Sequence, residues 1–477
     1  MQTNNQMLVV DLDQTLIKSD MLYESFWSGF SKDWLLPLKV LAYVFSNKVA
    51  LKKYLYDVSE VDIKNLPYNN SVINYIKVHK SKGGKVSLMT GSYYKFAEEI
   101  ALHLNLFDEV YGSINQINLK GIEKAKFQIK KYGSGKFDYI GDSASDLKSW
   151  SYANKAIIVN ASNSLKKKCI KNNPNTIILN HHNKKEFINN IFKEVRPHQW
   201  LKNLLVFVPM LSAQLLSLSV FYNALLAFVS FCFLASSVYI FNDLLDLESD
   251  RTHPQKCKRP FASGSLQINY GSLIALGITI LGFIIGSRLG MDFFIILLTY
   301  FFTTITYSLF LKRKALYDIF TLAGLYTIRM IGGGVATKIE VSFWLLAFAL
   351  FIFLSLAAIK RQSELFDLIK RDKNKVIRRG YEIKDINFIS QIAIFTGLLS
   401  SLIIALYMNS PDVLKLYPNP KYLWFACVSF LFWIVRICFQ TSRGAMYHDP
   451  IVFAFKDKVS FLNILIIISF VILAAKL

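Results

Sequence analysis

The sequence has few cysteines and no arrangement of them that would indicate a disulfide framework or a zinc site. Five cysteines are scattered along 477 residues, and none stands at a metal-ligand or paired spacing. They are Cys169, Cys232, Cys257, Cys427 and Cys438. We therefore expect reduced or buried thiols. The N-terminus also lacks a charged region followed by an apolar stretch, so we expect no signal peptide and a cytoplasmic start.

Acidic residues are scarce as well: 33 Asp and Glu stand against 55 Lys and Arg, which gives a net charge of +22. Such an excess could indicate nucleic-acid binding, but it is equally expected of the cytoplasmic loops of a membrane protein. The hydrophobic share of 53% and the aromatic share of 14% are too high for an ordinary soluble protein of this length. We therefore expect a membrane protein without a nucleic-acid partner.

The first 190 residues have the alternating periods of an α/β domain. Short apolar runs at 7–12, 86–89 and 137–140 predict buried strands, and each run leads directly into polar residues. Ligands in open, Rossmann-like α/β sheets gather at the carboxyl ends of strands, so these polar residues are candidates for one site. They are Asp11, Asp13, Thr90, Asp142 and Asp146.

In this order the motifs resemble the haloacid dehalogenase superfamily of phosphotransferases, over about residues 5–190. The resemblance implies that Asp11 is the nucleophile that becomes an aspartyl phosphate and that Asp13 is the general acid/base. Thr90 matches the hydroxyl that holds the phosphoryl group. A carboxylate attacks phosphorus well only when a metal and a lysine screen its charge.

The same resemblance implies a charge-neutralising lysine and a Mg²⁺ cofactor. Lys124 is the preferred lysine, although Lys120 and Lys126 compete for the role. The acidic residues expected at the metal are Asp11, Asp13, Asp142 and Asp146.

An insertion at about 20–80 has the size of a small helical cap. Its segment 34–45 is rich in apolar residues but too short to span a membrane. It is either a packed cap helix or an interfacial segment that brings the cap to a lipid-borne substrate.

The remainder, 191–477, predicts an all-α polytopic membrane domain of about nine helices. The apolar segments lie at approximately 204–218, 220–241, 268–287, 291–311, 315–335, 341–359, 388–408, 421–440 and 459–475. Alternate loops then carry most of the cations, which satisfies the positive-inside rule. We expect a protein of the bacterial inner membrane with the N-terminal domain 1–190 and the loop after the second segment on the cytoplasmic side.

That loop begins with three carboxylates, Asp243, Asp246 and Asp250, which share one face if they lie on a helix. Stacked carboxylates repel one another unless a cation sits between them, and hard oxygen ligands of this kind suit Mg²⁺. The plain alternative is a solvated acidic helix end. Cations for phosphate oxygens follow directly, which favours a diphosphate site; they are Arg251, His253, Lys256, Lys258 and Arg259.

The stretch 242–250 together with nine helices resembles the UbiA superfamily of intramembrane prenyltransferases, over about residues 190–477. Segments 196–203, 250–260 and 449–457 are similar to the branch that makes decaprenylphosphoryl-5-phosphoribose. The resemblance implies a donor, phosphoribosyl pyrophosphate (PRPP), and a polyprenyl phosphate acceptor. With the three aspartates as catalytic metal ligands, the implied substrate-binding residues are Lys202, Asn203, Asn242, Arg251, His253, Lys256, Arg259, Lys312, Arg329, Lys360, Arg361, Glu364 and Lys456.

Some of these residues have simpler interpretations. Arg329 lies within a predicted span and could belong to a structural ion pair, and 312–314 could be a topology signal.

Two functions remain open. One is a bifunctional enzyme that transfers phosphoribosyl and then removes the 5-phosphate, which would supply a precursor of cell-wall arabinan; a homo-oligomer is possible. The other is an aromatic prenyltransferase with a prenyl diphosphate donor and a separate phosphatase. A transporter or scaffold is disfavoured by the cluster of acids and bases at 243–259.

Overall fold

The computed structural model describes residues 6–44, 47–115, 117–179, 184–370, 380–446 and 450–476. The chain forms two compact units: unit 1 comprises Met1–Val195 with Tyr239–Ala275, and unit 2 comprises Arg196–Val238 with Leu276–Leu477. Residues 239–275, which follow the second predicted apolar segment, therefore pack with the N-terminal unit. The domain boundary that the sequence predicts between residues 190 and 191 remains a prediction.

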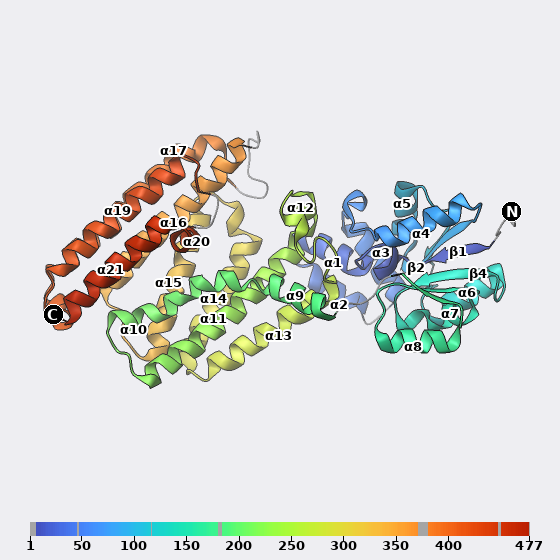
Figure 1. Cartoon of the computed structure of the whole chain (residues 1–477), viewed down its shortest axis with the longest axis horizontal. Coiled ribbons are helices and arrows are strands. Elements are labelled where there is room, and N and C mark those ends of the chain that lie inside the picture. Colours follow the sequence, from blue (N-terminus) through green and yellow to red (C-terminus); the bar gives the residue numbers. More distant parts are fainter. Residues whose placement is uncertain are drawn as a thin grey trace. The chain divides into compact units, whose positions relative to one another are not determined.

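Unit 1 is built on a sheet of six parallel strands in the order β3-β2-β1-β4-β5-β6. This is the predicted α/β architecture, and it forms the blue-to-teal part of the ribbon (Figure 1). The strands are β1 (Met7–Val10), β2 (Val86–Tyr93), β3 (Glu109–Ser113), β4 (Phe137–Gly141), β5 (Ala156–Ile158) and β6 (Thr176–Ile178).

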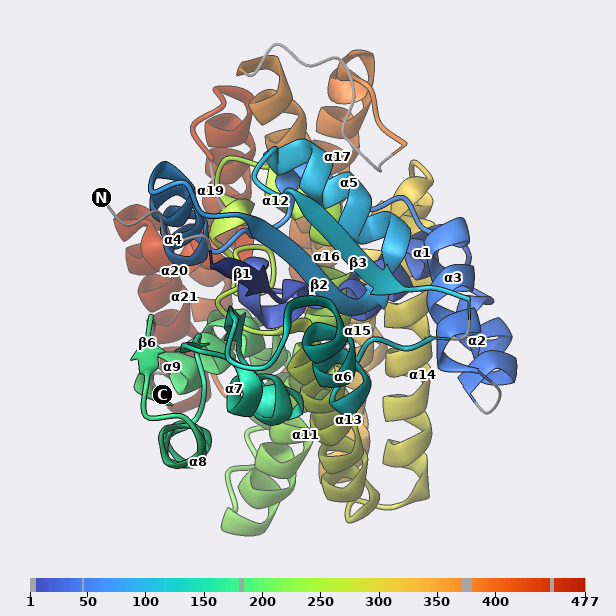
Figure 2. The same ribbon diagram turned by 90° about the vertical axis from the view of Figure 1, so that its right-hand side faces the viewer.

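Helices cover both faces of this sheet, as Figure 2 shows. Leu8 and Val10 of β1 pack on α4 (Asn70–Ser81) and α5 (Tyr94–Leu104), whereas Val9 faces the opposite core. That core includes α6 (Ile122–Tyr132), α7 (Leu147–Tyr152) and α8 (Asn163–Asn172). Successive strand residues point to opposite faces, so a strand buried on both sides is apolar throughout.

The predicted cap consists of α1 (Met21–Lys32), α2 (Leu36–Val44) and α3 (Lys48–Val58). Leu36 and Val40 of α2 are buried against Leu55 of α3, so the segment 34–45 forms a packed cap helix within its described residues. Its other face exposes three large apolar side chains, Trp34, Leu38 and Leu41. That face keeps the interfacial alternative open.

The rest of unit 1 comes from the border of the two predicted domains. It contains α9 (Lys184–Val195), the last turns of α11 (Leu218–Leu245), α12 (Leu247–Thr252), η5 (Lys256–Lys258) and the start of α13 (Ile268–Ser287). Phe241 of α11 packs its ring on those of Trp27 and Phe30 in α1, with centroids 5.7 Å apart in both cases. This aromatic contact joins the cap to residues 239–275.

Unit 2 is helical, as predicted for the membrane part. Across the described residues, eight helices of the chain are long and apolar enough to cross a membrane. They are α11, α13, α14 (Met291–Leu309), α15 (Tyr317–Thr337), α16 (Phe343–Lys370), α17 (Ile386–Tyr407), α19 (Tyr422–Ser442) and α21 (Lys458–Lys476). Short helices α18 (Pro411–Leu416) and α20 (Pro450–Lys456) lie between the last of them.

The first predicted span, 204–218, is not a long α-helix. The structure has a 3₁₀-helix η4 (Pro197–Phe207), then α10 (Val208–Ser212) and turn residues. Pro209 contributes to this break, because proline lacks the N–H that an α-helix interior requires. The expected nine long helices are thus eight among the described residues.

The segment before α11 bears on the number of membrane crossings. Unit 1 contains both Val195 and Tyr239, so the chain leaves this unit and returns to it between them. Helix α11 is one candidate span, and the crossing predicted for 204–218 stays a prediction. An 11-residue 3₁₀-helix and a five-residue α-helix have a combined length of about 30 Å. This matches the hydrocarbon core of a bilayer, about 30 Å thick.

Candidate functional site

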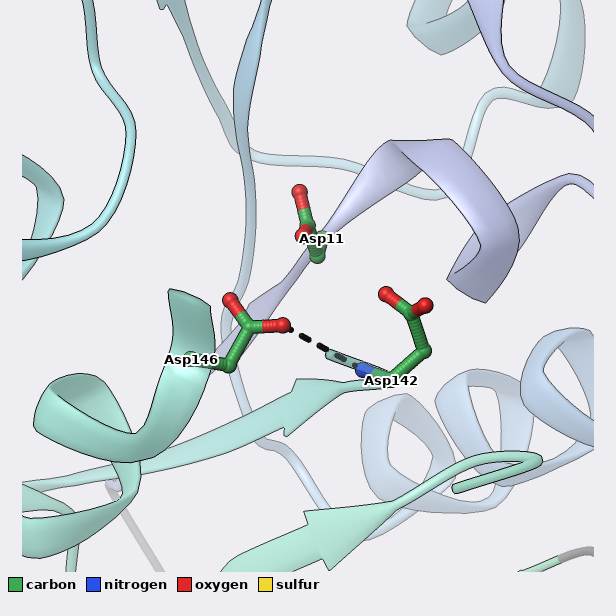
Figure 3. Close-up of side chains that lie close together, drawn as sticks. All are labelled: Asp11, Asp142 and Asp146. Atoms are coloured by element: carbon green, nitrogen blue, oxygen red, sulfur yellow. Dashed lines mark hydrogen bonds between the residues drawn. The ribbon is translucent and has the colours of Figure 1, made fainter. Parts of the chain in front are cut away.

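Three carboxylates meet at the carboxyl edge of the sheet in unit 1. Asp11 directly follows β1, while Asp142 and Asp146 follow β4, the neighbouring strand. Figure 3 shows the three side chains turned toward one another. One oxygen from each lies within 4.8 Å of the others, a spacing that a single metal ion could bridge.

Lys124 is the lysine that reaches this group. Its Nζ lies 2.8 Å from Asp11 Oδ1 and 3.7 Å from Asp146 Oδ1, and its side chain is 4% exposed. It also donates to the Tyr139 hydroxyl at 3.1 Å, which in turn donates to Asp146 Oδ1 at 2.7 Å. Lys126 instead pairs with Glu123 at the surface. Lys124 thus contacts Asp11 directly, whereas Lys120 lies near Asp20.

Asp146 orients the loop that carries Asp142. Its Oδ2 accepts hydrogen bonds from the backbone N–H groups of Asp142 and Ser143, at 3.3 and 3.1 Å, and from the Ser143 hydroxyl at 2.9 Å. Asp142 itself accepts one from the Thr15 hydroxyl at 3.3 Å. Asp11 and Asp142 thus have the more open oxygens.

Asp13 lies apart from this acidic group. Its Oδ1 accepts the backbone N–H of Met21 at 2.8 Å, and its Oδ2 accepts the Ser92 hydroxyl at 2.5 Å and the Thr90 hydroxyl at 3.4 Å. The metal-ligand group found among the described residues does not include Asp13. The carboxylate is instead held between the start of α1 and the end of β2, which suits the expected acid/base role.

Burial raises the pKa values of these acids. The pKa of Asp11 is raised to about 7, chiefly by burial, against the opposing charge of Lys124 and with a further contribution from Asp146. Burial, reinforced by Asp20, raises the pKa of Asp13 to about 6. Asp142 also has a raised pKa because it is buried beside Asp146 and Asp11. One lysine does not compensate this negative charge, and a divalent cation fits the donor set.

The cap contributes a lysine that the sequence did not reveal. Lys52 of α3 donates to the Gly91 carbonyl at 2.5 Å and to Asn118 Oδ1 at 2.9 Å. Lys52 therefore lies beside the Thr90 motif, and its positive charge interacts with the charges of Asp13 and Asp20. No local pattern marks Lys52, because only the folded position of the cap brings it to the sheet edge.

The second acidic group of unit 1 begins in α11. The predicted single helix is interrupted at Asp246, which caps α12, although the N–H of Asp246 still bonds to the Asn242 carbonyl at 2.9 Å. Asp243 and Asp250 remain buried and converge on one guanidinium nitrogen: Arg259 Nη1 lies 2.8 Å from Asp243 Oδ1 and 2.5 Å from Asp250 Oδ2. The two carboxylates thus share one cation.

Asn242 adds a donor atom to this second group. Its side-chain Oδ1 is buried and has no hydrogen-bond partner within the described chain. A buried acceptor without a partner costs stability, so it fits a metal or a ligand hydroxyl. Asn242 directly precedes Asp243 in the chain, and amide and carboxylate oxygens are hard ligands of the kind that Mg²⁺ takes.

The cations expected behind these acids have different partners. Lys256 Nζ lies 4.0 Å from Asp250 Oδ1, and His253 Nδ1 accepts the backbone N–H groups of Gln255 and Lys256. Arg251 turns away from them and donates two hydrogen bonds to Glu24 of the cap helix α1, at 2.5 and 3.1 Å. Both side chains of that ion pair are buried.

In unit 2 the structure brings together two predicted residues from distant segments. Arg329 of α15 donates to Asn203 Oδ1 of η4 at 2.7 Å and to the Tyr300 hydroxyl at 2.8 Å. Its guanidinium carbon also lies 4.8 Å from the centre of the Tyr300 ring. Arg329 is 5% exposed, and none of its partners in the described chain is a carboxylate.

Arg361, unlike Arg329, has carboxylate partners. It pairs with Asp318 and Glu364, and its Nη2 donates to the Tyr307 hydroxyl at 3.2 Å. Arg361 and Asp318 are 1% and 0% exposed in their side chains. This network accounts for Arg361 and Glu364 structurally, and Asp318 was not foreseen from the sequence.

A third group of unit 2 is cationic. His198 lies in η4, is partly buried and is near the charges of Arg196, Lys202 and Lys456. Lys202 and Lys456 stand far apart in sequence and were both predicted to bind phosphate. The two other predicted lysines are Lys312 in η6 (Leu311–Arg313) and Lys360 in α16.

Comparison with known proteins identifies a family for the membrane part of the chain. Residues 204–439 match the model of the UbiA prenyltransferase family. An uncharacterized protein, y4nM, of Sinorhizobium fredii is 33% identical over 97% of this chain and 90% of the relative. The decaprenyl-phosphate phosphoribosyltransferase of Mycolicibacterium smegmatis is 36% identical over 42% of this chain, which spans 63% of that relative.

Two solved structures are similar over different parts. A UbiA homolog from Archaeoglobus fulgidus bound to GPP and Mg²⁺ covers 59% of this chain and 99% of its own, with a TM-score of 0.47 and 16% identity. A substrate-bound phosphoserine phosphatase covers 39% and 97%, with a TM-score of 0.28 and 16% identity.

In unit 1, Asp11, Lys124, Asp142 and Asp146 meet at the carboxyl edge of a parallel sheet. Through its membrane part the chain belongs to the UbiA prenyltransferase family.

Proposed function

We propose that the protein transfers 5-phosphoribosyl from PRPP to a polyprenyl phosphate and then removes the 5-phosphate, giving polyprenylphosphoryl ribose. The observation that carries the transferase half is the pair of buried carboxylates, Asp243 and Asp250, that share one cation in a UbiA family chain. The name of the mycobacterial relative supports PRPP and a polyprenyl phosphate as substrates.

In the transfer step, a phosphate oxygen of the lipid forms a bond to ribose C1 while the C1–O bond to pyrophosphate breaks. The acceptor is already anionic, so no strong base is needed. Asp243, Asp250 and Asn242 Oδ1 would hold Mg²⁺, and Arg259 and Lys256 are the nearest protein cations for pyrophosphate oxygens. Positioning and electrostatic stabilisation supply most of the rate enhancement.

Unit 2 offers the remaining charges for the substrates. The cationic group Arg196, His198, Lys202 and Lys456 suits phosphate oxygens. Arg329 suits an anion within the helical bundle, because no carboxylate of the described residues offsets its charge. Intramembrane ionisable residues of this kind are functional candidates by default.

In the phosphatase step, Asp11 attacks the 5-phosphate and the P–O bond to ribose C5 breaks. Asp13 gives its proton to the leaving ribose oxygen and then takes a proton from the water that hydrolyses the aspartyl phosphate. Lys124 and the Thr90 motif hold the phosphoryl oxygens, and Asp11, Asp142 and Asp146 would hold Mg²⁺. Bound Mg²⁺ would screen phosphate charge at both sites.

The test is mass spectrometry of the lipid made by purified protein from PRPP, polyprenyl phosphate and Mg²⁺. We expect wild-type protein to give polyprenylphosphoryl ribose. Asp11→Asn should stop at the 5-phosphorylated lipid with transfer preserved, and Asp243→Ala should make neither lipid. If the protein ignores PRPP but consumes geranyl or longer prenyl diphosphates with an aromatic acid, the prenyltransferase alternative is correct.

A further inference from the structure

A cavity of about 660 Å³ in unit 1 opens beside the phosphatase carboxylates. Gln14 and Asp142 line one part of its wall. The carboxylate of Asp142 lies within 4.8 Å of that of Asp11, so a ligand in the cavity adjoins the proposed nucleophile. We therefore expect the cavity to hold the part of the substrate that carries the phosphate.

Another part of the wall comes from residues 264–270, which belong to the membrane half of the sequence. Gly264 lies so close to the N-terminal domain that an added Cβ would be 2.7 Å from Lys18 Cβ and 3.0 Å from Pro67 Cβ. Its φ of +70° also favours glycine. This segment is packed tightly against the phosphatase fold.

Helix α9 holds the same segment from a second direction. Asn190 Nδ2 donates to the Ser265 carbonyl at 3.2 Å, and the Phe187 ring packs edge-on against Tyr270 with centroids 5.2 Å apart. Gln267 and Tyr270 belong to this segment, and both line the cavity together with Asp142.

The position of Tyr270 connects the cavity to the membrane. Tyr270 is in the first turn of α13, which begins at Ile268 and is a candidate membrane span. Tyrosine is common at the level of lipid headgroups, where its ring is apolar and its hydroxyl is wet. The cavity is lined by Asp142 of the phosphatase site and by Tyr270 at the start of a candidate span, and this position suits a lipid headgroup.

The cavity wall carries two cations as well as two acids. Lys18 and Lys168 line it together with Asp142 and Glu186, apart from the lysine that contacts Asp11. A lipid-linked phosphosugar has a terminal phosphate for Asp11 and a phosphodiester to the lipid, which these two lysines can attract.

We propose that this cavity is the binding site for the lipid-linked 5-phosphosugar, and that Gln267 and Tyr270 are specificity residues of the phosphatase supplied by the transferase half. The proposal rests on the proposed function and names the substrate class of its second site. A phosphatase domain completed by the first turn of a membrane helix favours lipid-borne over soluble phosphates.

The experiment uses full-length protein in nanodiscs and two phosphatase substrates, the 5-phosphorylated lipid and p-nitrophenyl phosphate. For Gln267→Ala and Tyr270→Leu, we expect the ratio of the two kcat/KM values, lipid over soluble, to fall about tenfold. That is the effect of losing about 1.4 kcal/mol of binding. Tyr317→Leu is the matched control, because Tyr317 also begins a candidate span but does not line the cavity.

A second measurement does not depend on turnover. In an Asp11→Asn background, the Kd for the 5-phosphorylated lipid should rise about tenfold with Gln267→Ala or Tyr270→Leu and stay constant with Tyr317→Leu. An unchanged Kd would overturn the cavity proposal even if the wild type dephosphorylates the lipid. Tight, variant-sensitive binding without hydrolysis by the wild type would instead support the cavity and overturn the proposed phosphatase reaction.

Discussion

At the scale of single residues, two buried arginines of unit 2 differ in what offsets their charge. Arg361 pairs with Asp318 and Glu364, whereas Arg329 has only neutral partners in the described chain, among them Asn203 and Tyr300. Removing one member of a buried ion pair leaves the other charge uncompensated and costs about 3–5 kcal/mol. Removing an arginine with neutral partners costs only hydrogen bonds, each about 1 kcal/mol.

We therefore predict opposite phenotypes for Arg361→Met and Arg329→Met. Arg361→Met should lower the thermal unfolding temperature and the yield of folded protein. Arg329→Met should be folded and inserted, but its phosphoribosyl transfer should fall at least about tenfold, because the anion that Arg329 binds loses its partner. Thermal unfolding in detergent and the transfer assay measure the two effects. Equal losses of stability would show that Arg329 is structural too.

The residues found at the first site show what a sequence can predict. Asp11 and Asp142 each follow an apolar strand, and Thr90 lies in the last half of β2. Parallel strands bring their carboxyl ends to one edge, so the convergence of these residues could be expected. Lys52 and Tyr139 could not be foreseen as partners of this site. Lys52 reaches it through the fold of the cap, and Tyr139 is a strand residue whose hydroxyl contacts Lys124 and Asp146.

At the scale of secondary-structure elements, α1 contacts both catalytic centres proposed for unit 1. The backbone N–H of its first residue, Met21, donates to Asp13. Three residues later, Glu24 holds Arg251, which directly follows Asp250 in α12. The sequence predicted a helical cap at about 20–80, but the pairing of α1 with α12 joins residues more than two hundred positions apart and follows no local pattern.

This ion pair predicts that a cap residue affects the transferase. In Glu24→Gln, Arg251 loses its carboxylate partner and competes for Asp250, so the Mg²⁺ concentration for half-maximal transfer should rise about fivefold. The exchange Glu24→Arg with Arg251→Glu should recover part of the loss, since contacting residues couple by about 0.5–3 kcal/mol. Glu60→Gln is the control, because Glu60 pairs with Lys32 at the cap surface. A Glu24→Gln enzyme with unchanged Mg²⁺ dependence would contradict the prediction.

At the scale of the whole molecule, the number of membrane crossings decides which parts of the chain share a compartment. Apolar length predicted eight of the segments well, because long apolar runs become helices in lipid. The short segment 204–218 was predicted as a helix like the others, and hydropathy could not reveal that 196–217 begins as a 3₁₀-helix. The packing of residues 239–275 with unit 1 also depends on tertiary contacts alone, so hydropathy could not reveal it.

The last prediction concerns that short segment. If residues 196–217 cross the membrane, then Lys148 and Cys257 lie on one side, and Ser217, between α10 and α11, lies on the other. Cys257 is partly exposed, whereas the other four cysteines are buried, so Cys257→Ser gives a background of low reactivity. In that background Lys148→Cys and Ser217→Cys each introduce one reactive thiol.

An impermeant maleimide should label native Cys257 and Lys148→Cys only in inverted vesicles, which places both on the cytoplasmic side. It should label Ser217→Cys only in right-side-out vesicles. Labelling of Lys148→Cys and Cys257 from opposite sides would show that 196–217 does not cross, and would exclude the contact between Glu24 and Arg251.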